Sequence, residues 1–273
     1  MSLARAALLI AQEEYPQLPV DLYMARLDQL AEETKDRLAA ETAGPVVLQE
    51  LIRTLYERHG LRGNTETYYD PRNSLLNDVL DRGLGIPLTL SIIMLEVGWR
   101  LDLPLEGVNF PAHFLVRYRG AAERILVDPF NPEALRFEDQ AQQLLDGQFG
   151  GMVRMRSDFL RSASKRDMIL RLLLNLKGLY VNARDAPRTL AVTERILLLR
   201  PGAAGELRDS GMLLARLGRI GEARERLMQY LEVAPEADDA TRVWALLEKL
   251  GEEGTQEPSD WPAGDPPNFG RGS

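Results

Sequence analysis

The chain has 273 residues and a formal net charge of −8, which argues against a nucleic-acid or anionic-membrane partner because both need a basic surface. It contains no cysteine and only two histidines, so disulfides, thiolate catalysis, thiolate metal sites and multi-histidine metal centres are excluded, and we expect neither a metal nor a cofactor. The longest apolar runs are too short to cross a bilayer and the first residues make a poor secretory signal, which predicts a cytoplasmic protein.

The first hundred residues are predicted to be helical, because apolar residues recur there at three- and four-residue spacing. Asp21 is placed to cap the second helix and Ser74 to cap the fourth. Residues 60–73 are dense in Gly, Asn, Asp and Pro and are expected to form a loop. The predicted helices span residues 2–14, 20–40, 45–59, 74–82 and about 88–101.

Short runs rich in Val, Ile, Phe and Tyr then replace the helical pattern and predict antiparallel strands. If the last two strands form a hairpin about Gly120, the numbers of paired residues sum to roughly 241, which sets His113 opposite Asp128. A carboxylate beside an imidazole fixes its tautomer and stabilises its protonated form. The alternative is a half-buried histidine satisfied by a structural aspartate. The strands are expected at 105–110, 113–119 and 124–130, followed by a helix at 136–145 and a hinge at 147–164.

From about residue 165 the chain is predicted to be helical again and to contain a repeat. Pro201 and Pro235 end two similar segments and lie 34 residues apart, which is the period of the tetratricopeptide repeat (TPR). Because fewer than three repeats rarely stand alone, these two and a capping helix at 236–250 are expected to pack on the front domain. The residue types that the motif prefers are Leu176, Tyr180 and Pro201 in the first copy and Gly211, Gly218, Ala223 and Pro235 in the second.

The segments "GLGIPLTLSIIMLEVGWRLDLPLEGV", "AHFLVR" and "LVDPF" resemble the papain-type core of transglutaminase-like proteins. The resemblance sets Gly85 and Pro104 on a glycine and a proline of that core. It sets His113 and Asp128 on the second and third members of the catalytic triad. The nucleophilic cysteine of the family falls on Pro87, which has neither a thiol nor an N–H for an oxyanion hole.

A narrower resemblance, carried by residues 64–131 and by the repeats up to about residue 250, is to the bacterial SirB-type family. That family combines a transglutaminase-like domain with a TPR tail. The resemblance therefore implies an α+β, mostly helical, degenerate papain-like fold with a small antiparallel sheet. We expect a transglutaminase-like domain at 1–160, TPR-like helices at 161–250 and a disordered acidic tail, rich in Pro and Gly, at 251–273.

Two further groups of residues bear on a site. Thr89 and Ser91 follow Pro87 closely and carry hydroxyls, but small polar residues in the first turns of a buried helix are the simpler interpretation. The loop "NTETYYDPRNS" is polar and aromatic, as binding loops often are, although such a loop can also use its side chains to satisfy its own backbone. The residues expected to line a polar pocket around His113 are Asn64, Tyr69, Asn73, Arg82, Asn109 and Asn131.

Three functions are consistent with these patterns. The first is a non-catalytic interaction or regulatory protein that binds a protein or peptide through a cleft and through its TPR helices. The second is a cysteine-free hydrolase or amide-bond enzyme, in which His113 activates water or a hydroxyl and Asp128 orients it. The third gives the pair a purely structural role. The missing nucleophile favours the first function, with the third compatible beside it.

Overall fold

The computed structural model describes residues 2–39, 42–111, 113–121, 124–131, 136–137 and 140–252. The chain divides into two compact units, one ending at Leu172 and the other beginning at Leu173. The fold is mostly helical with a small antiparallel sheet, which confirms the predicted fold class. Residues 253–273 of the predicted tail lie outside the described residues, whereas residues 251 and 252 belong to the last helix rather than to the tail.

The first unit is built around one buried helix, α5 (Pro87–Arg100), whose residues from Pro87 to Gly98 are all buried. Glu96 on this helix accepts hydrogen bonds from the Ser2 hydroxyl at 3.0 Å and from the Ala4 N–H at 2.9 Å, and so ties the start of α1 to α5. The helical elements around α5 are α1 (Leu3–Ala11), α2 (Val20–Lys35), α3 (Gly44–Ile52), the π-helix η1 (Arg53–Arg58), the short 3-10 helix η2 (Pro71–Asn73) and α4 (Leu76–Arg82).

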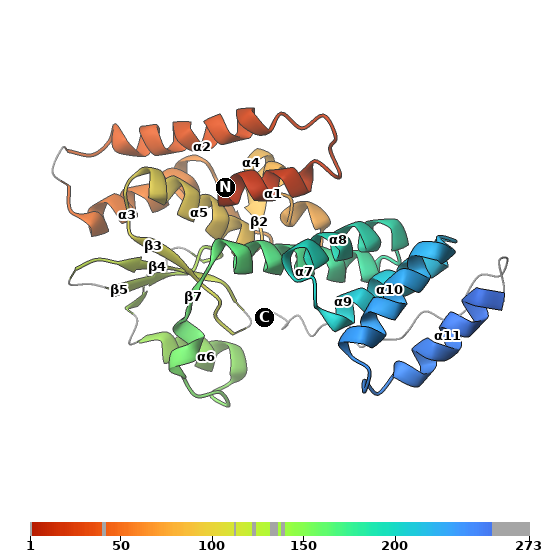
Figure 1. Cartoon of the computed structure of the whole chain (residues 1–273). Helices are drawn as coiled ribbons and strands as arrows, with labels where there is room; N and C mark the ends of the chain where they lie inside the picture. The colour runs from red at the N-terminus through yellow and green to blue at the C-terminus, as the bar shows by residue number, and fades with distance from the viewer. Residues whose placement is uncertain are drawn as a thin grey trace. The chain divides into compact units, whose positions relative to one another are not determined.

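A five-stranded antiparallel sheet, in the order β6-β5-β4-β3-β7, forms the other layer of this unit. Helix α5 and its neighbours lie on one face of the sheet, and α6 (Ala141–Phe149) lies on the other (Figure 1). Val108, Leu126 and Leu145 belong to the apolar cluster beneath the sheet. The strands are β3 (Leu105–Val108), β4 (Leu115–Arg119), β5 (Arg124–Val127), β6 (Arg136–Phe137) and β7 (Ser162–Ala163).

The register of the central hairpin differs from the predicted one by two. Val116 pairs with Val127 and Arg119 with Arg124, so paired residue numbers sum to 243 (116 + 127) rather than to about 241. β4 begins at Leu115, so His113 precedes the ladder and lies in the turn after Phe110, whose carbonyl accepts the His113 N–H at 3.0 Å. Asp128 directly follows β5. The histidine therefore reaches the aspartate from the turn and not as a cross-strand partner.

Several predicted local features are wrong. Asp21 lies in the first turn of α2, but no side chain caps that helix, and Ser74 follows η2 while Leu75 occupies the N-cap of α4. The predicted helix at 136–145 begins instead with the two-residue strand β6, which pairs with β5, and the helix starts at Ala141. The predicted hinge contains η4 (Ser157–Leu160) and strand β7, which pairs with β3.

The chain enters α5 through a tight connection. Gly83 ends α4 in the left-handed region at a φ of 71°, and a Cβ there would lie 2.9 Å from the carbonyl oxygen of Gly60. Strand β2 (Leu84–Gly85) then pairs in parallel with β1 (Arg62–Gly63). Pro87 follows as the first residue of α5, where its missing N–H costs no helical hydrogen bond. The predicted helix start is therefore confirmed.

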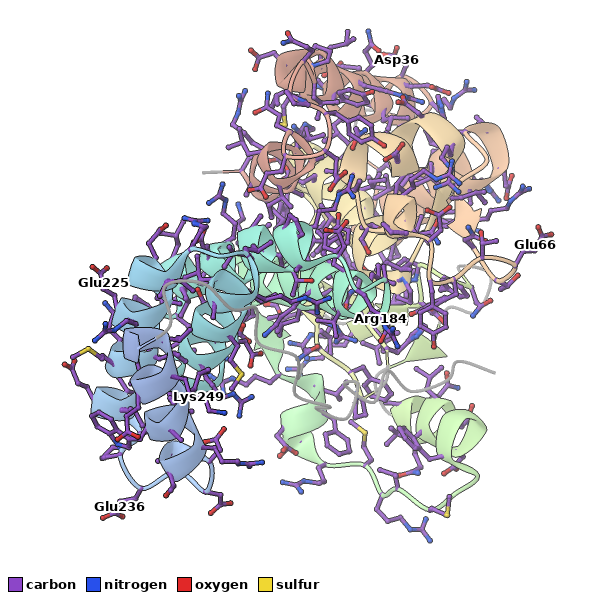
Figure 2. The ribbon with its side chains drawn as sticks, turned by 90° about the vertical axis from the view of Figure 1, so that its right-hand side faces the viewer. Asp36, Glu66, Arg184, Glu225, Glu236 and Lys249 are labelled. Carbon is purple, nitrogen blue, oxygen red and sulfur yellow. The ribbon has the colours of Figure 1, made fainter. Side chains whose placement is uncertain are left out.

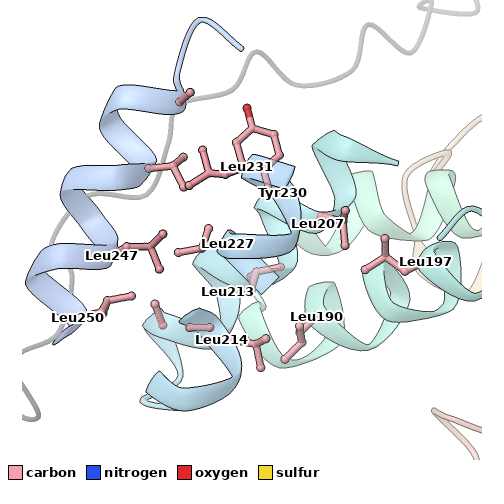
Figure 3. Packing of buried hydrophobic residues seen from close by; sticks show 14 of the residues in the cluster. Leu190, Leu197, Leu207, Leu213, Leu214, Leu227, Tyr230, Leu231, Leu247 and Leu250 are labelled. Carbon is pink, nitrogen blue, oxygen red and sulfur yellow. The ribbon is translucent and has the colours of Figure 1, made fainter. Parts of the chain in front are cut away.

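The described part of the second unit is a series of helices, as the 34-residue period predicts. Its core is an apolar cluster that joins α8 to α11 and includes Leu190, Leu213, Leu227 and Leu247 (Figure 3). Gly211 lets α9 and α10 approach closely, because a Cβ there would lie 2.6 Å from Leu227 Cγ. The helices are α7 (Lys165–Asn182), which crosses the boundary between the units, α8 (Ala186–Leu199), α9 (Ala204–Arg216), α10 (Ile220–Val233) and α11 (Ala240–Glu252).

Candidate functional site

His113 and Asp128 form a direct pair in the first unit. Nε2 of His113 lies 2.6 Å from Oδ1 of Asp128, and the two side chains are 12% and 10% exposed. With Nε2 held by the carboxylate, Nδ1 is the ring nitrogen left for another group, and it has no hydrogen-bond partner among the described residues. The pair thus has the geometry of a base and its orienting carboxylate.

The surroundings of Asp128 keep its carboxylate ionised. Burial alone would raise its pKa, but hydrogen bonds from His113, from the Phe130 N–H at 2.9 Å and from the Asn131 side-chain amide at 3.2 Å outweigh burial. The pKa of Asp128 therefore lies below its ordinary value. Nearby, the half-buried Tyr56 donates its hydroxyl to the Pro129 carbonyl at 2.8 Å, which fixes the main chain just after the aspartate.

A chain of aromatic rings borders the histidine. The Phe130 ring meets the His113 ring edge-on at 6.3 Å between centroids, and Tyr68 meets Phe130 at 6.1 Å. Tyr69 stands against Tyr68 at 5.3 Å and is 54% exposed. Gly63 admits the Phe130 ring, because a Cβ at that position would lie 2.5 Å from it. The rings form a continuous aromatic chain from the buried pair to the exterior.

Arg171, in the first half of α7, is far along the chain from these residues but lies beside Asn109, Phe114 and Tyr68. Its guanidinium donates to the side-chain oxygen of Asn109 and lies over the Phe114 ring, 5.6 Å from the centroid. Burial raises the pKa of Tyr68, and the nearby charge of Arg171 opposes that rise. Sequence reasoning missed Arg171 and Phe130, because no motif or spacing connects a helix arginine or a post-strand phenylalanine with the histidine.

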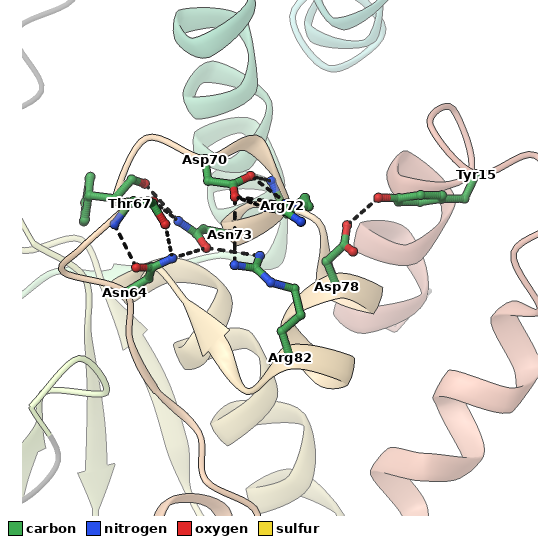
Figure 4. Close-up of polar contacts among 9 residues, drawn as sticks. Tyr15, Asn64, Thr67, Asp70, Arg72, Asn73, Asp78 and Arg82 are labelled. Atoms are coloured by element: carbon green, nitrogen blue, oxygen red, sulfur yellow. Dashed lines mark hydrogen bonds and ion pairs between the residues drawn. The ribbon is translucent and has the colours of Figure 1, made fainter.

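Several side chains of the polar loop before α4 form hydrogen bonds within the loop itself. Asn64 donates to Thr67 at 2.9 Å and to Asn73 at 3.0 Å, and Asn73 donates to the Thr67 carbonyl at 2.7 Å (Figure 4). Both asparagines are buried, as the internal-satisfaction alternative predicts. Glu66 points outward from this loop (Figure 2).

The residues expected around His113 therefore separate into two groups. Asn131 lies against the Asp128 carboxylate, Asn109 binds Arg171, and Tyr69 is exposed at the end of the aromatic chain. Asn64 and Asn73 belong to the loop network instead. Arg82 contacts that network too, 3.4 Å from Asn73 Oδ1 and 3.9 Å from Asp70, and within the described residues it forms no hydrogen bond or ion pair with His113 or Asp128.

The hydroxyls near Pro87 are both buried and engaged. Ser91 Oγ donates to the Pro87 carbonyl at 2.7 Å. Thr89 Oγ1 donates to the Asn73 carbonyl at 2.7 Å and accepts the Ile86 N–H at 3.1 Å. Each side chain is 0% exposed. Neither hydroxyl is placed to replace a thiol, because a nucleophile needs access to substrate and a neighbouring base.

Two kinds of site find no support in the part of the chain that the structure describes. There, His, Asp and Glu form no group of three or more that could hold a metal ion. Among the described helices, none combines the length and apolar character needed to cross a membrane.

A buried helix that meets an antiparallel sheet, with a histidine–aspartate pair at the sheet, defines a transglutaminase-like domain, and here it is followed by TPR-type helices. Residues 21–174 match the family model described as the transglutaminase-like superfamily, and residues 176–248 match that of the tetratricopeptide repeat. The chain belongs to the transglutaminase-like superfamily and, within it, to the bacterial UPF0162 family that includes SirB1.

The curated relatives extend over most of the chain. A UPF0162 protein of Xylella fastidiosa (strain 9a5c) is 35% identical over 94% of this chain and 92% of its own length. A UPF0162 protein of Pseudomonas aeruginosa is 31% identical over 92% of this chain and 90% of its own length. Protein SirB1 of Salmonella typhimurium is 29% identical over 78% of each chain. No solved structure matches the chain.

Proposed function

We propose that this chain is a non-catalytic interaction or regulatory protein of the cytoplasm, built on a degenerate transglutaminase-like fold. The observation that carries the proposal is the state of the nucleophile position. Pro87 stands there, buried and without a thiol, and the hydroxyls of Thr89 and Ser91 are engaged with main-chain groups. A domain that keeps the fold of an enzyme without a reactive nucleophile retains its surface for binding.

The proposed binding face in the first unit is the aromatic chain that ends at Tyr69, together with His113 and Asn131. Aromatic side chains give a large contact area at low entropic cost, and they dominate protein–protein binding energies. A protein or peptide is the fitting ligand for such a face. In the second unit, the TPR helices provide a separate docking surface, with Leu198 and Trp244 73% and 54% exposed.

The test is affinity capture with crosslinking, using the purified chain as bait in a bacterial lysate. Tyr69→Ala truncates an exposed ring of the proposed face, and Leu22→Ala removes another exposed apolar side chain, on α2, as the matched control. Loss of this aromatic contact is expected to weaken capture about tenfold or more, while the control leaves it unchanged. Trp244→Ala makes the same test of the second unit. Failure of the wild type to enrich any protein, or equal capture by all variants, would count against the proposal.

One observation favours a second function, a cysteine-free hydrolase or amide-bond enzyme. His113 is held by an ionised carboxylate at 2.6 Å and leaves Nδ1 without a hydrogen-bond partner among the described residues. Such an imidazole is able to take a proton from water or from a substrate hydroxyl. This function predicts turnover of an amide or ester that His113→Ala abolishes.

A further inference from the structure

Arg171 is a half-buried cation that has no counter-charge among the residues that the structure describes. No Asp or Glu lies within ion-pair distance of it among the described residues, and its one hydrogen bond goes to the neutral side chain of Asn109. Other covered arginines of this unit are paired: Arg100 with Asp28 at 2.6 Å and with Glu96 at 2.7 Å, and Arg117 with Glu106 at 2.7 Å. Unlike Arg100 and Arg117, Arg171 is therefore covered without a carboxylate partner among the described residues.

Most of the donor capacity of Arg171 remains available. A guanidinium carries five N–H donors, and Asn109 accepts from one nitrogen. None of its nitrogens is among the buried side-chain atoms that lack a partner in the described part of the chain, so the remaining donors reach the surface. Phe114 supports one face of the group, which restricts its rotation. The guanidinium is held in place and still able to bind.

The energetics favour an anion at this position. Burial lowers the pKa of Arg171, because removing water disfavours the charged form, and in the described part of the chain no carboxylate offsets this effect. An oxyanion would restore the lost stabilisation through paired, charge-assisted hydrogen bonds. The rings of Tyr68 and Phe114 beside the guanidinium favour a ligand that carries an apolar group next to its anionic group.

We infer that Arg171 binds a carboxylate group of a peptide ligand, that Asn109 orients the guanidinium, and that Tyr68 contacts the apolar group next to the carboxylate. This inference rests on the proposed function in one respect, since it takes the face around His113 as the peptide-binding face. The carboxylate comes either from the C-terminus of the peptide or from an acidic side chain, and the probes below separate the two.

The experiment is a ligand-observed saturation-transfer titration of the full chain. N-acetyl-phenylalanine carries a C-terminal carboxylate, N-acetyl-glutamate α-amide carries only a side-chain carboxylate, and N-acetyl-phenylalanine amide carries none. We expect saturable binding of at least one carboxylate probe, about tenfold tighter than binding of the amide, a difference typical of a charge-assisted bidentate pair. Equal binding of acid and amide, or no binding of either acid, would overturn the inference.

Variants tie the binding to this side chain. Arg171→Gln is expected to weaken binding of the carboxylate probe about tenfold. Arg171→Lys is expected to weaken it by less, since lysine keeps the charge but cannot form the paired hydrogen bonds of a guanidinium. Arg161→Gln, at an exposed position of the same unit, makes the same change in net charge and is expected to have no effect. If Arg171→Gln fails to fold, Asn109→Ala, at an exposed position, is expected to weaken binding several-fold. Unchanged binding in the Arg171 variants, or in Asn109→Ala where that variant replaces them, would overturn the inference.

Two controls separate the outcomes. Tighter binding of inorganic phosphate than of either carboxylate probe would overturn the assignment of a carboxylate ligand. In the affinity capture described above, a partner lost with Tyr69→Ala but kept with Arg171→Gln would overturn this inference while the proposed function stands. Carboxylate binding that depends on Arg171, combined with no captured protein, would support the site and contradict the proposed function.

Discussion

The contribution of the His113–Asp128 pair to stability is expected to be unequal between its two members. Asp128→Ala deprives three donors of their acceptor at once, namely His113 Nε2, the Phe130 N–H and the Asn131 amide. A buried donor left without its acceptor costs about 1–3 kcal/mol, so we expect the loss of the shared acceptor to cost about 4 kcal/mol in Asp128→Ala. His113→Ala removes one charge-assisted hydrogen bond and leaves the carboxylate with two other donors, so we expect it to cost about 2 kcal/mol.

Urea unfolding at pH 7 measures both costs. Trp99 lies in the first unit, so its fluorescence reports on the unit that contains the pair. A Trp244→Phe, Trp261→Phe background removes the other two indole signals. The midpoint should fall about twice as far for Asp128→Ala as for His113→Ala, with the slope of the unfolding free energy against urea unchanged.

The reverse order would refute this reasoning. If His113→Ala costs as much as Asp128→Ala, the three-donor arrangement around the carboxylate does not determine its energy. If His113→Ala instead leaves the free energy of unfolding unchanged or increases it, the histidine does not stabilise the fold, as is common for residues of functional sites. A purely structural role for the pair would then be excluded.

Three further outcomes follow from the geometry. Gly63→Ala would drive a Cβ to within 2.5 Å of the Phe130 ring, so we expect a loss of about 1–3 kcal/mol, measured by thermal unfolding. Burial alone would raise the pKa of Glu106, but its bonds to Ser162 and two arginines lower it from 4.5 to about 2. Its stabilising effect is therefore full above pH 4.5 and lost as the pH falls toward 2, so unfolding curves of the wild type and Glu106→Gln should converge over that range; a constant difference would contradict the assignment. Ser91→Ala removes only a bond to a main-chain carbonyl and is expected to change stability by less than about 1.5 kcal/mol and to leave partner capture unchanged; loss of capture would give this hydroxyl a role that its burial argues against.

The sequence predicted the features that depend on neighbours along the chain. Apolar spacing located the helices, and the 34-residue separation of Pro201 and Pro235 located the repeats. The pairing of His113 with Asp128 was anticipated from a hairpin about Gly120. The register was wrong by two, because the position of the turn residue alone does not fix which residues pair; the hydrophobic pattern of both strands and the turn set it together.

Features that depend on distant contacts were not predictable. Strands β6 and β7 are two residues long and exist because β5 and β3 pair with them, which no local pattern records. Arg171 reaches Asn109 and Phe114 from a helix that begins after the whole sheet has formed along the chain. The asparagines of the polar loop were also not assignable from sequence. Asparagine is common both in binding sites and in loops whose side chains hydrogen-bond to their own backbone.

A screen of amide and ester substrates with the wild type and His113→Ala decides between binding and bond-breaking. Both proteins should be purified in parallel, and folding of the variant should be checked by circular dichroism. We expect no turnover above the uncatalysed rate with either protein, because the nucleophile position holds Pro87 and the adjacent hydroxyls are engaged. Turnover by the wild type that disappears in a folded His113→Ala variant would contradict a non-catalytic role.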